Sequence, residues 1–406
     1  MSPAHWESTD LASQCEIMSG FPFSSASFTD DDDDVHLVKG ENVSQGAVLW
    51  EISKRWPRAQ FDDFQRFKLM PGDVVLAMDR PWVPAGLKFA RIEEGAPDSL
   101  LVQRVARLRA GRTLDQLFLS YVIGSPHFES YIKNAVRGVT VPHISGAEIG
   151  AFRFGLPPID RQRAIATRLL DFDQLIHNNR RRIKLLEDSV RLVFEEWFVR
   201  GASDSWPTAL LQEVCMEDSG IQTGPFGSQL HQCDYADEGV PVVMPKDIAR
   251  MRVDTATVAR IPEHLADELG RHRMRRGDIV FGRRGEIGRR AYIGSRQDGY
   301  FCGTGCLRLR ADPKGVNSRF LFEMLGTSLV AGEIANRAKG STMPNLSAGA
   351  LQDVPIPLPP RVMQDRFAEL AEDVADQIDV LDAQSRKLCV ARDLLLPRLM
   401  NGAVEV

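Results

Sequence analysis

The sequence predicts an internal pseudo-twofold repeat in which two globular blocks alternate with two long helices. The segment LPPIDRQ at Leu156–Gln162 returns as LPPRVMQ at Leu358–Gln364. Each copy is followed by about forty residues without proline or glycine until the last turn, a length typical of one long helix. Apolar residues recur in both stretches at alternating steps of four and three, the spacing of helices that pair along a seam.

The repeat extends beyond this one segment. A shift of 202 residues aligns Thr140 with Thr342, Pro142 with Pro344, Ser145 with Ser347, Gln162 with Gln364 and Ile176 with Ile378. Further upstream, PGDVVL (71–76) resembles RGDIVF (276–281), and SGFPFSS (19–25) loosely resembles TGPFGSQ (223–229). Because these features occur in the same order in both halves, each half is expected to be a block of roughly 150 residues followed by a helix.

These patterns predict four segments. They are a first block at 1–157, a first helix at 158–200, a second block at 201–359 and a second helix at 360–406. Paired prolines precede each helix, where proline is tolerated, and Gly201 and Gly402 are expected to end them.

The heptad spacing identifies the residues expected to face the partner helix. In the first helix they are Ile165, Leu169, Phe172, Ile176, Ile183, Leu186 and Val190, and in the second Phe367, Val374, Ile378, Leu381, Leu388 and Leu395. A whole block separates the helices in sequence, so a hairpin with a short loop is excluded. An antiparallel pair fits the repeat best and would carry one block at each end. Asn179, on the seam, either specifies the register or is a buried polar residue without that role.

Composition is that of a globular protein, with 406 residues, 43% of them hydrophobic and 26% charged. No apolar run has the length of a membrane span, and the first residues lack a signal-peptide pattern. Six dispersed cysteines favour reduced thiols, and so a cytoplasmic location. The net charge of −5 does not support a globally basic nucleic-acid binder, so any such role must depend on local patches.

One such patch is predicted at Arg271–Arg296, which holds nine arginines and only two acids. Its pattern indicates a strand, a glycine-rich loop and a second strand. Arginine suits both phosphates and guanine in the major groove, although a solvated charged face is the simpler alternative. The candidate DNA contacts are Lys246, Arg283, Arg284, Arg289 and Arg290, together with Ser228, Lys339 and Ser341 of the second block and Arg80 and Arg137 of the first.

The first block differs from the second in its candidate loops. Five acids at Asp30–Asp34 would repel DNA and are expected to form a solvated loop. AMDRPWVP (77–84) takes the place of the arginine-rich loop, and KNAVRGVT (133–140) takes that of KGST (339–342). Different loops on matching scaffolds predict two different DNA half-sites.

Patterns for other chemistry are weak. No phosphate-binding GxxxxGK[ST] segment occurs. Cys302 and Cys306 could form part of a zinc site only with an uncommon spacing. Asp278 and Glu286 could be a nuclease carboxylate pair, but the surrounding arginines favour binding. No nucleophile and base are suitably arranged.

With these residues the chain resembles the specificity subunits of type I restriction–modification systems. The resemblance is carried by GPFGSQL, GVPVVMPKDI, RRGDIVFGRRGEIGRRAYI, KGSTMPNLSAGALQDVPIPLPPRVMQDRF and VTVPHISGAEIGAFRFGLPPIDRQRAIA. It implies an α/β (α+β) fold with two target-recognition domains joined by an antiparallel coiled coil. In the first block GFPFSS departs from the Gly-Pro-Phe-Gly-Ser form, which leaves the contacts of that block open.

The resemblance also implies a function. Such a subunit is non-catalytic, binds an asymmetric two-part sequence in double-stranded DNA, and docks two methyltransferase (M) subunits and, through them, restriction/translocase (R) subunits. AdoMet, ATP and Mg²⁺ belong to those partners, so no cofactor is expected on this chain. Two alternatives remain open: a coiled-coil scaffold without sequence-specific DNA binding, and a stand-alone DNA nuclease or methyltransferase.

Overall fold

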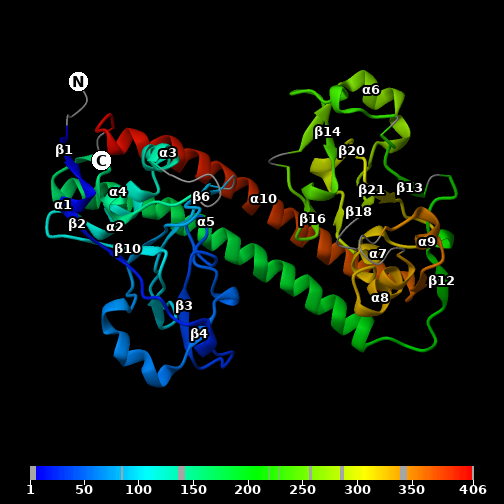
Figure 1. Cartoon of the computed structure of the whole chain (residues 1–406). Helices are drawn as coiled ribbons and strands as arrows, with labels where there is room; N and C mark the ends of the chain where they lie inside the picture. Colours follow the sequence, from blue (N-terminus) through cyan, green and yellow to red (C-terminus); the bar gives the residue numbers. More distant parts are fainter. Residues whose placement is uncertain are drawn as a thin grey trace. The chain divides into compact units, whose positions relative to one another are not determined.

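The computed structural model describes the chain except for residues 1–5, 84–85, 136–141, 219, 228, 256–257, 284–287, 339–344 and 405–406. The chain forms two compact units, unit 1 with residues 1–180 and 383–406 and unit 2 with residues 181–382 (Figure 1). Each unit holds one block and half of each long helix. The units therefore cut across the four predicted segments, because both long helices are shared.

In unit 1 the block is built on a four-stranded sheet in the order β2-β10-β5-β8. The strands are β2 (Cys15–Ser19), β10 (Val105–Ala110), β5 (Val74–Ala77) and β8 (Phe89–Arg91). A second sheet holds β4 (Arg55–Trp56), β3 (Val35–Val38) and β9 (Ser99–Leu101), with β3 parallel to β9. Two further pairs are β1 (Glu7–Asp10) with β11 (Arg153–Leu156), and β6 (Trp82–Val83) with β7 (Gly86–Leu87). The helices are α1 (Leu11–Gln14), α2 (Gln116–Ile123), α3 (Pro126–Ala135) and α4 (Gly146–Gly150).

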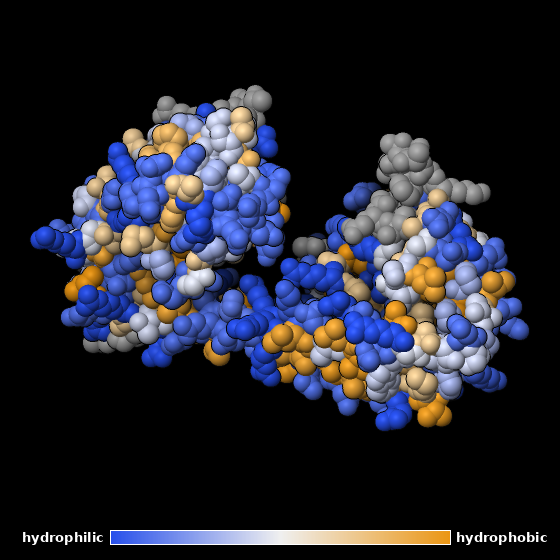
Figure 2. Space-filling view, turned by 90° about the horizontal axis from the view of Figure 1, so that it is seen from below, coloured by the Kyte–Doolittle hydropathy of each residue, from blue (hydrophilic) through white to orange (hydrophobic). Residues whose placement is uncertain are grey.

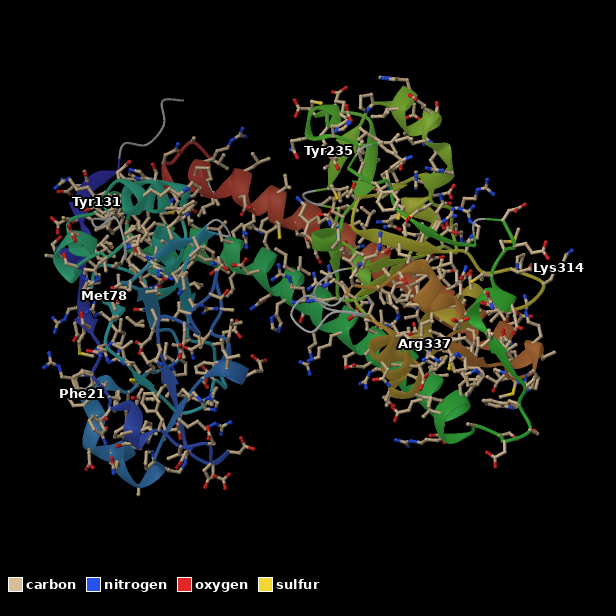
Figure 3. All side chains as sticks on the ribbon, turned by 45° about the vertical axis from the view of Figure 1, so that its right-hand side comes forward. Phe21, Met78, Tyr131, Tyr235, Lys314 and Arg337 are labelled. Carbon is tan, nitrogen blue, oxygen red and sulfur yellow. The ribbon has the colours of Figure 1, made fainter. Side chains whose placement is uncertain are left out.

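The layers of block 1 can be followed in Figure 3. Phe21 lies in an aromatic cluster at one end of the block, Tyr131 lies in the helical layer at the other end, and Met78 lies between them. In the cluster, the ring centroids of Phe21 and Phe23 are 5.0 Å apart, and those of Phe23 and Trp56 are 4.8 Å apart. Aromatic burial therefore holds the second sheet together.

Unit 2 repeats this topology. Its four-stranded sheet has the order β13-β21-β18-β19, and its three-stranded sheet places β14 parallel to β20. The strands are β12 (Thr208–Leu210), β13 (Ile221–Thr223), β14 (Val240–Val243), β15 (Ile248–Ala249), β16 (Arg252–Val253), β17 (Ala259–Ile261), β18 (Ile279–Gly282), β19 (Arg290–Tyr292), β20 (Phe301–Cys302), β21 (Cys306–Leu309) and β22 (Pro355–Pro357). The helices are α6 (Glu263–Glu268), α7 (Ser318–Met324), α8 (Ser328–Arg337) and α9 (Ala348–Gln352). The predicted internal repeat is confirmed.

The repeated Gly-Asp of PGD and RGD is structural. The carboxylate of Asp278 accepts hydrogen bonds from the amide of Arg275 at 2.7 Å and from Nε and Nη2 of Arg310, each at 2.7 Å. In block 1, Asp73 binds Arg109 in the same two-pronged way, at 2.6 and 2.8 Å. The preceding glycines both have φ +91°, a backbone conformation that glycine adopts without strain. The motif thus closes a turn and anchors it to the neighbouring strand.

The repeated Leu-Pro-Pro and glutamine are also explained by hydrogen bonds. Gln162 accepts the amide of Asp115 at 2.8 Å and donates to the carbonyl of Pro157 at 2.8 Å. Gln364 makes the same bonds with Asn317 and Pro359, both at 2.9 Å. Both glutamines are buried, so each satisfies backbone groups that would otherwise lack a partner where a long helix begins.

Each long helix begins one residue after the predicted start, and the second ends at Met400, before the end of its predicted segment at 406. α5 (Ile159–Phe194) begins directly after Pro158, continues as a π-helical turn at Glu195–Arg200, and ends at Gly201. α10 (Arg361–Met400) begins directly after Pro360, and Gly402 follows it with φ +72°.

Every residue of the predicted seam is buried or half-buried. In unit 1, the start of α5 at Ile165 shares a core with the end of α10 at Leu399. In unit 2, Phe194 near the end of α5 lies 5.2 Å from Phe367 near the start of α10, measured between ring centroids. The two helices are therefore antiparallel in each unit.

One polar cluster interrupts the seam in unit 1. Arg392 donates to Asp173 at 2.7 Å, and the other oxygen of this carboxylate accepts the hydroxyl of Tyr121 at 2.6 Å. These contacts join α10, α5 and α2. The pKa of Tyr121 is raised, chiefly by burial and secondly by its hydrogen bond to Asp173. The phenol therefore stays protonated and acts as the donor.

Candidate nucleic-acid interface

Loops gather at one end of the four-stranded sheet of unit 2. β13 and β18 end there, and β21 and β19 begin there. We call this end the loop edge of block 2 and define it by residues 224, 245–246, 283, 289, 303–305 and 346. A Cβ atom on Gly224 would lie 2.0 Å from the carbonyl oxygen of Gly303, so only glycine fits. This close packing explains the first glycine of GPFGSQL.

Three of the predicted cations lie at this edge. Lys246 is exposed. Arg283 is half-buried, and its Nε donates to the carbonyl of Leu346 at 3.0 Å. Arg289 donates from Nη1 to the carbonyl of Pro245 at 3.3 Å. The edge thus holds three cations from two segments of the chain, the one after β14 and the connection between β18 and β19.

Arg290 is placed differently from its prediction. It belongs to β19, not to the loop, and its Nε donates to the carbonyl of Phe322 at 3.0 Å. Its guanidinium also lies 4.9 Å from the centre of the Phe322 ring. Burial lowers its pKa. This position weighs against the predicted DNA contact, because the side chain packs on Phe322 of α7.

The arginine-rich segment is not one continuous cationic surface. Arg273 pairs with Glu263 at 2.5 Å, and Arg276 pairs with Glu372 at 2.7 Å. Arg296 lies 3.6 Å from Asp379, whose pKa is raised chiefly by burial. The last two pairs attach the block to α10 within unit 2, so part of the segment is structural.

The matching end of the sheet in unit 1 carries Arg80, which is exposed and follows β5. Its amide donates to the carbonyl of Pro142 at 2.7 Å, and its φ is +46°. The segment after β5 thus occupies the place of the arginine-rich loop, as predicted. The acidic segment is exposed and partly paired, since Arg55 lies 2.8 Å from a carboxylate oxygen of Asp32.

The other predicted DNA contacts lie outside the described residues. They are Arg137, Ser228, Arg284, Lys339 and Ser341.

A second group of polar residues in block 1 was not predicted from sequence. Nη1 of Arg104 lies 3.1 Å from each oxygen of Asp79, and Nδ1 of His143 lies 2.6 Å from one of them. These residues come from three separate segments, so no local motif marks them.

The alternative chemistries are disfavoured. Asp278 is bound to Arg310 and is not available as a nuclease carboxylate. Cys302 and Cys306 are buried, and burial raises the pKa of Cys302 to about 12, which opposes the thiolate that zinc requires. Within the part of the chain that the structure describes, no three or more His, Cys, Asp or Glu side chains are grouped to hold a metal ion.

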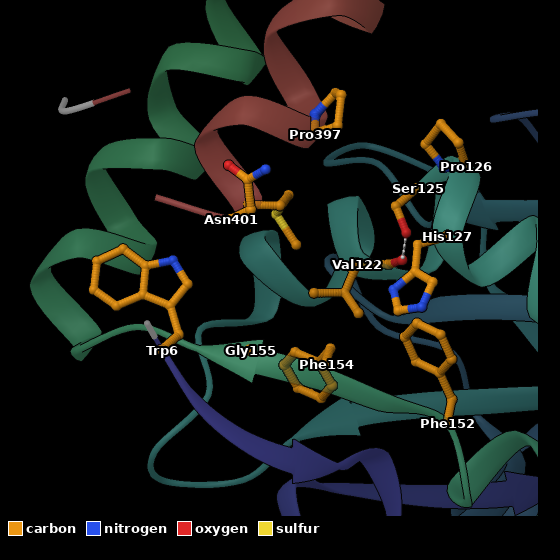
Figure 4. Close-up of a pocket in the computed structure, with 11 residues that line it drawn as sticks. Trp6, Val122, Ser125, Pro126, His127, Phe152, Phe154, Gly155, Pro397 and Asn401 are labelled. Atoms are coloured by element: carbon orange, nitrogen blue, oxygen red, sulfur yellow. Dashed lines mark hydrogen bonds between the residues drawn. The ribbon is translucent and has the colours of Figure 1, made fainter. Parts of the chain in front are cut away.

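A cavity of about 340 Å³ lies in unit 1 (Figure 4). It is bordered by β11, by the start of α3 and by the end of α10, and its lining is mainly apolar, including Trp6, Val122, His127, Phe154 and Pro397. None of the predicted DNA contacts that the structure describes lines this cavity.

Comparison with known proteins agrees with this architecture. A family model described as the type I restriction modification DNA specificity domain matches residues 261–388. The chain is 27% identical over 192 residues to the type I restriction enzyme MjaVIII specificity subunit of Methanocaldococcus jannaschii, covering 47% of this chain and 45% of that one. It is 31% identical over 175 residues to the EcoAI specificity subunit of Escherichia coli, covering 43% and 29%. The alignments thus span less than half of these two relatives.

A solved structure shows the same fold over nearly the whole chain. The type I restriction–modification S subunit from M. genitalium superposes with a TM-score of 0.62 at 16% identity, covering 98% of this chain and 96% of that one. In the described residues, no helix has both the length and the apolar character needed to cross a membrane.

Proposed function

Because the chain belongs to the family of type I restriction–modification specificity subunits, we propose that it recognises DNA sequence for such a system and catalyses no reaction itself. Each block would read one part of an asymmetric two-part target. The observation that carries this proposal is the pair of matching sheet ends with different side chains. Block 2 presents Lys246, Arg283 and Arg289, whereas block 1 presents Arg80 and Arg104.

The chemistry of these loops supports DNA as the ligand. Arginine and lysine side chains contact phosphates, and arginine can also bind guanine with two donors. The loops come from the ends of a rigid sheet, so a scaffold with constant packing can carry variable contacts. Sheet order, turn motif and glutamine anchor are the same in both units, while the loop residues differ. This division is expected when two blocks recognise different bases.

Docking of two methyltransferase subunits is part of the proposal. Leu192 on α5 and Leu394 on α10 occupy matching positions, 202 residues apart, and both are exposed, at 55% and 62%. Large apolar side chains that stay exposed at matching places on both long helices are candidates for a protein contact. The apolar surface of α5 within unit 2 is visible in the space-filling view (Figure 2). Two exposed leucines at matching positions suit two copies of one partner. AdoMet, ATP and Mg²⁺ would then be bound by partner subunits, including an R subunit, in the cytoplasm.

The recognition proposal is tested by selecting bound duplexes from a random library with the purified full-length chain. We expect enrichment of two short sequences separated by a constant unread spacer. Arg283→Ala with Arg289→Ala should weaken binding and lower the salt dependence by about one unit for each lost phosphate contact. Lys314→Ala is the matched control, because this exposed lysine follows β21 at the opposite end of the sheet.

The alternatives give different results in the same experiments. A scaffold would enrich no sequence. A stand-alone enzyme would methylate or cleave DNA when the chain alone is supplied with AdoMet and Mg²⁺. Docking is tested separately by native mass spectrometry with the methyltransferase, where Leu192→Asp and Leu394→Asp should each remove one bound copy. Retention of both copies in the double variant would refute the docking sites.

A further inference from the structure

The internal repeat allows the two sheet ends to be compared position by position. In block 1, the amide of Met78 donates to the carbonyl of Arg104 at 2.8 Å, and the amide of Ile144 donates to the carbonyl of Met78 at 2.9 Å. In block 2, Arg283 bonds in the same way to Gly305 at 2.9 Å and to Leu346 at 2.8 Å. Arg104 therefore stands where block 2 has Gly305.

The backbone at this position favours glycine. φ is +83° at Gly305 and +69° at Arg104. A side chain in this left-handed region costs of order 1–2 kcal/mol, and glycine avoids that cost. Among the described residues only Arg80, Arg104, Arg250 and Met251 are non-glycine residues with positive φ, and three of them are arginines. Since glycine satisfies the turn in block 2, the turn itself does not explain an arginine in block 1.

The side chain of Arg104 is exposed yet held in place. Its exposed fraction is 60%, and only its Nη1 contacts Asp79, at 3.1 Å from both oxygens. Nδ1 of His143 also lies 2.6 Å from this carboxylate, so two side chains hold Asp79 in place. No partner for Nε or Nη2 occurs among the described residues. This edge of the guanidinium retains the two parallel donors that guanine accepts through O6 and N7.

We propose that Arg104 is a specificity-determining residue of block 1 that reads a guanine in its half of the DNA target, with Asp79 as its positioning residue. The inference rests on the proposed function and deepens it. It also accounts for the difference between the blocks. Block 2 presents its cations at Lys246, Arg283 and Arg289. Block 1 instead carries an arginine at the turn position where block 2 has Gly305.

The test is Arg104→Gly in the full-length chain. Glycine is the residue that block 2 uses at this position, so the melting temperature should be unchanged or higher. Binding to the duplex selected by the wild-type chain should fall roughly five- to 150-fold, the range expected for loss of a two-donor contact to guanine. One base pair of the first half-site should lose its preference in a fresh selection, while the second half-site stays unchanged.

Two further variants separate positioning from charge. Asp79→Asn should keep the wild-type melting temperature within a few degrees and relax the preference at the same base pair. Arg112→Gly removes one exposed arginine of block 1 in the turn before α2 and should change neither affinity nor preference.

Each outcome has a defined meaning. If the wild-type chain selects no sequence, the proposed function fails. If it selects one and Arg104→Gly keeps every base preference, Arg104 is not a reader and the inference is overturned. A uniform loss of affinity with a lower salt slope would make Arg104 a phosphate contact and would also overturn it.

Discussion

Replacing Asp278 by asparagine should destabilise block 2 more than any conservative change at its surface. The side chain is 1% exposed, accepts two hydrogen bonds from Arg310, and accepts the amide of Arg275. Asparagine keeps the size but removes the charge, so the guanidinium of Arg310 loses its counter-ion in a half-buried site. Breaking a buried pair in this way costs about 3–5 kcal/mol. For a unit of this size the melting temperature should fall by roughly 6–20 °C.

The assay is thermal unfolding of the full-length chain together with hydrogen exchange of its amides. In Asp278→Asn, protection should be lost first in β18 and β21. The matched variant Asp73→Asn removes the corresponding carboxylate, which is 4% exposed, and should weaken β5 and β10 instead. The double variant Asp278→Asn with Arg310→Met should cost less than the sum of its parts, because the two residues interact directly. A melting temperature lowered by less than about 2 °C in Asp278→Asn, with unchanged hydrogen exchange, would refute this reasoning.

Three further changes test the helices and the block. Ile378→Asp buries an unpaired charge at a position that is 4% exposed and should cost several kcal/mol in urea unfolding, whereas Val380→Asp, half exposed, should cost little. Burial lowers the pKa of His272 to about 4, so the folded block stays neutral while the unfolded chain gains a proton below pH 6.5. Stability should therefore fall, by at most about 3 kcal/mol, as pH decreases from about 6.5 toward 4, and His272→Phe should flatten that dependence in melting curves across this range. Deleting residues 183–189 together with 385–391 shortens both helices by about 10 Å, and methylation mapping of the assembled system should show a spacer shorter by up to about three base pairs. An unchanged spacer in an active complex would exclude the helices as the determinant of spacing.

The seam was predictable because it depends on local periodicity, and the repeat was predictable because its two copies keep matching residues at a constant offset of 202. Heptad spacing can be recognised within a single stretch of sequence, and proline is favoured at the first positions of a helix. The arginine-rich segment was harder to interpret, because the acids that neutralise Arg276 and Arg296 lie more than eighty residues later, on α10. Nothing in the local sequence separates those arginines from Arg283 and Arg289.

Arg104 was missed for a related reason. Its distinguishing feature is a backbone angle, and that angle becomes informative only when the equivalent residue of the other block is known to be Gly305. Simple alignment at either offset does not bring these two residues together. Backbone hydrogen bonds identify the equivalence where sequence comparison does not.

The division of each long helix between the units has a consequence for proteolysis and cooperativity. The chain passes from one unit to the other at 180–181 and again at 382–383, and both passages lie inside continuous helix. Domain boundaries usually fall in exposed linkers that proteases cut readily. Here a protease would have to act on hydrogen-bonded helix to separate the units. Unfolding that begins in one block can also propagate along the helical backbone into the other. A substitution that destabilises either block is therefore expected to shorten the folded lifetime of the whole chain.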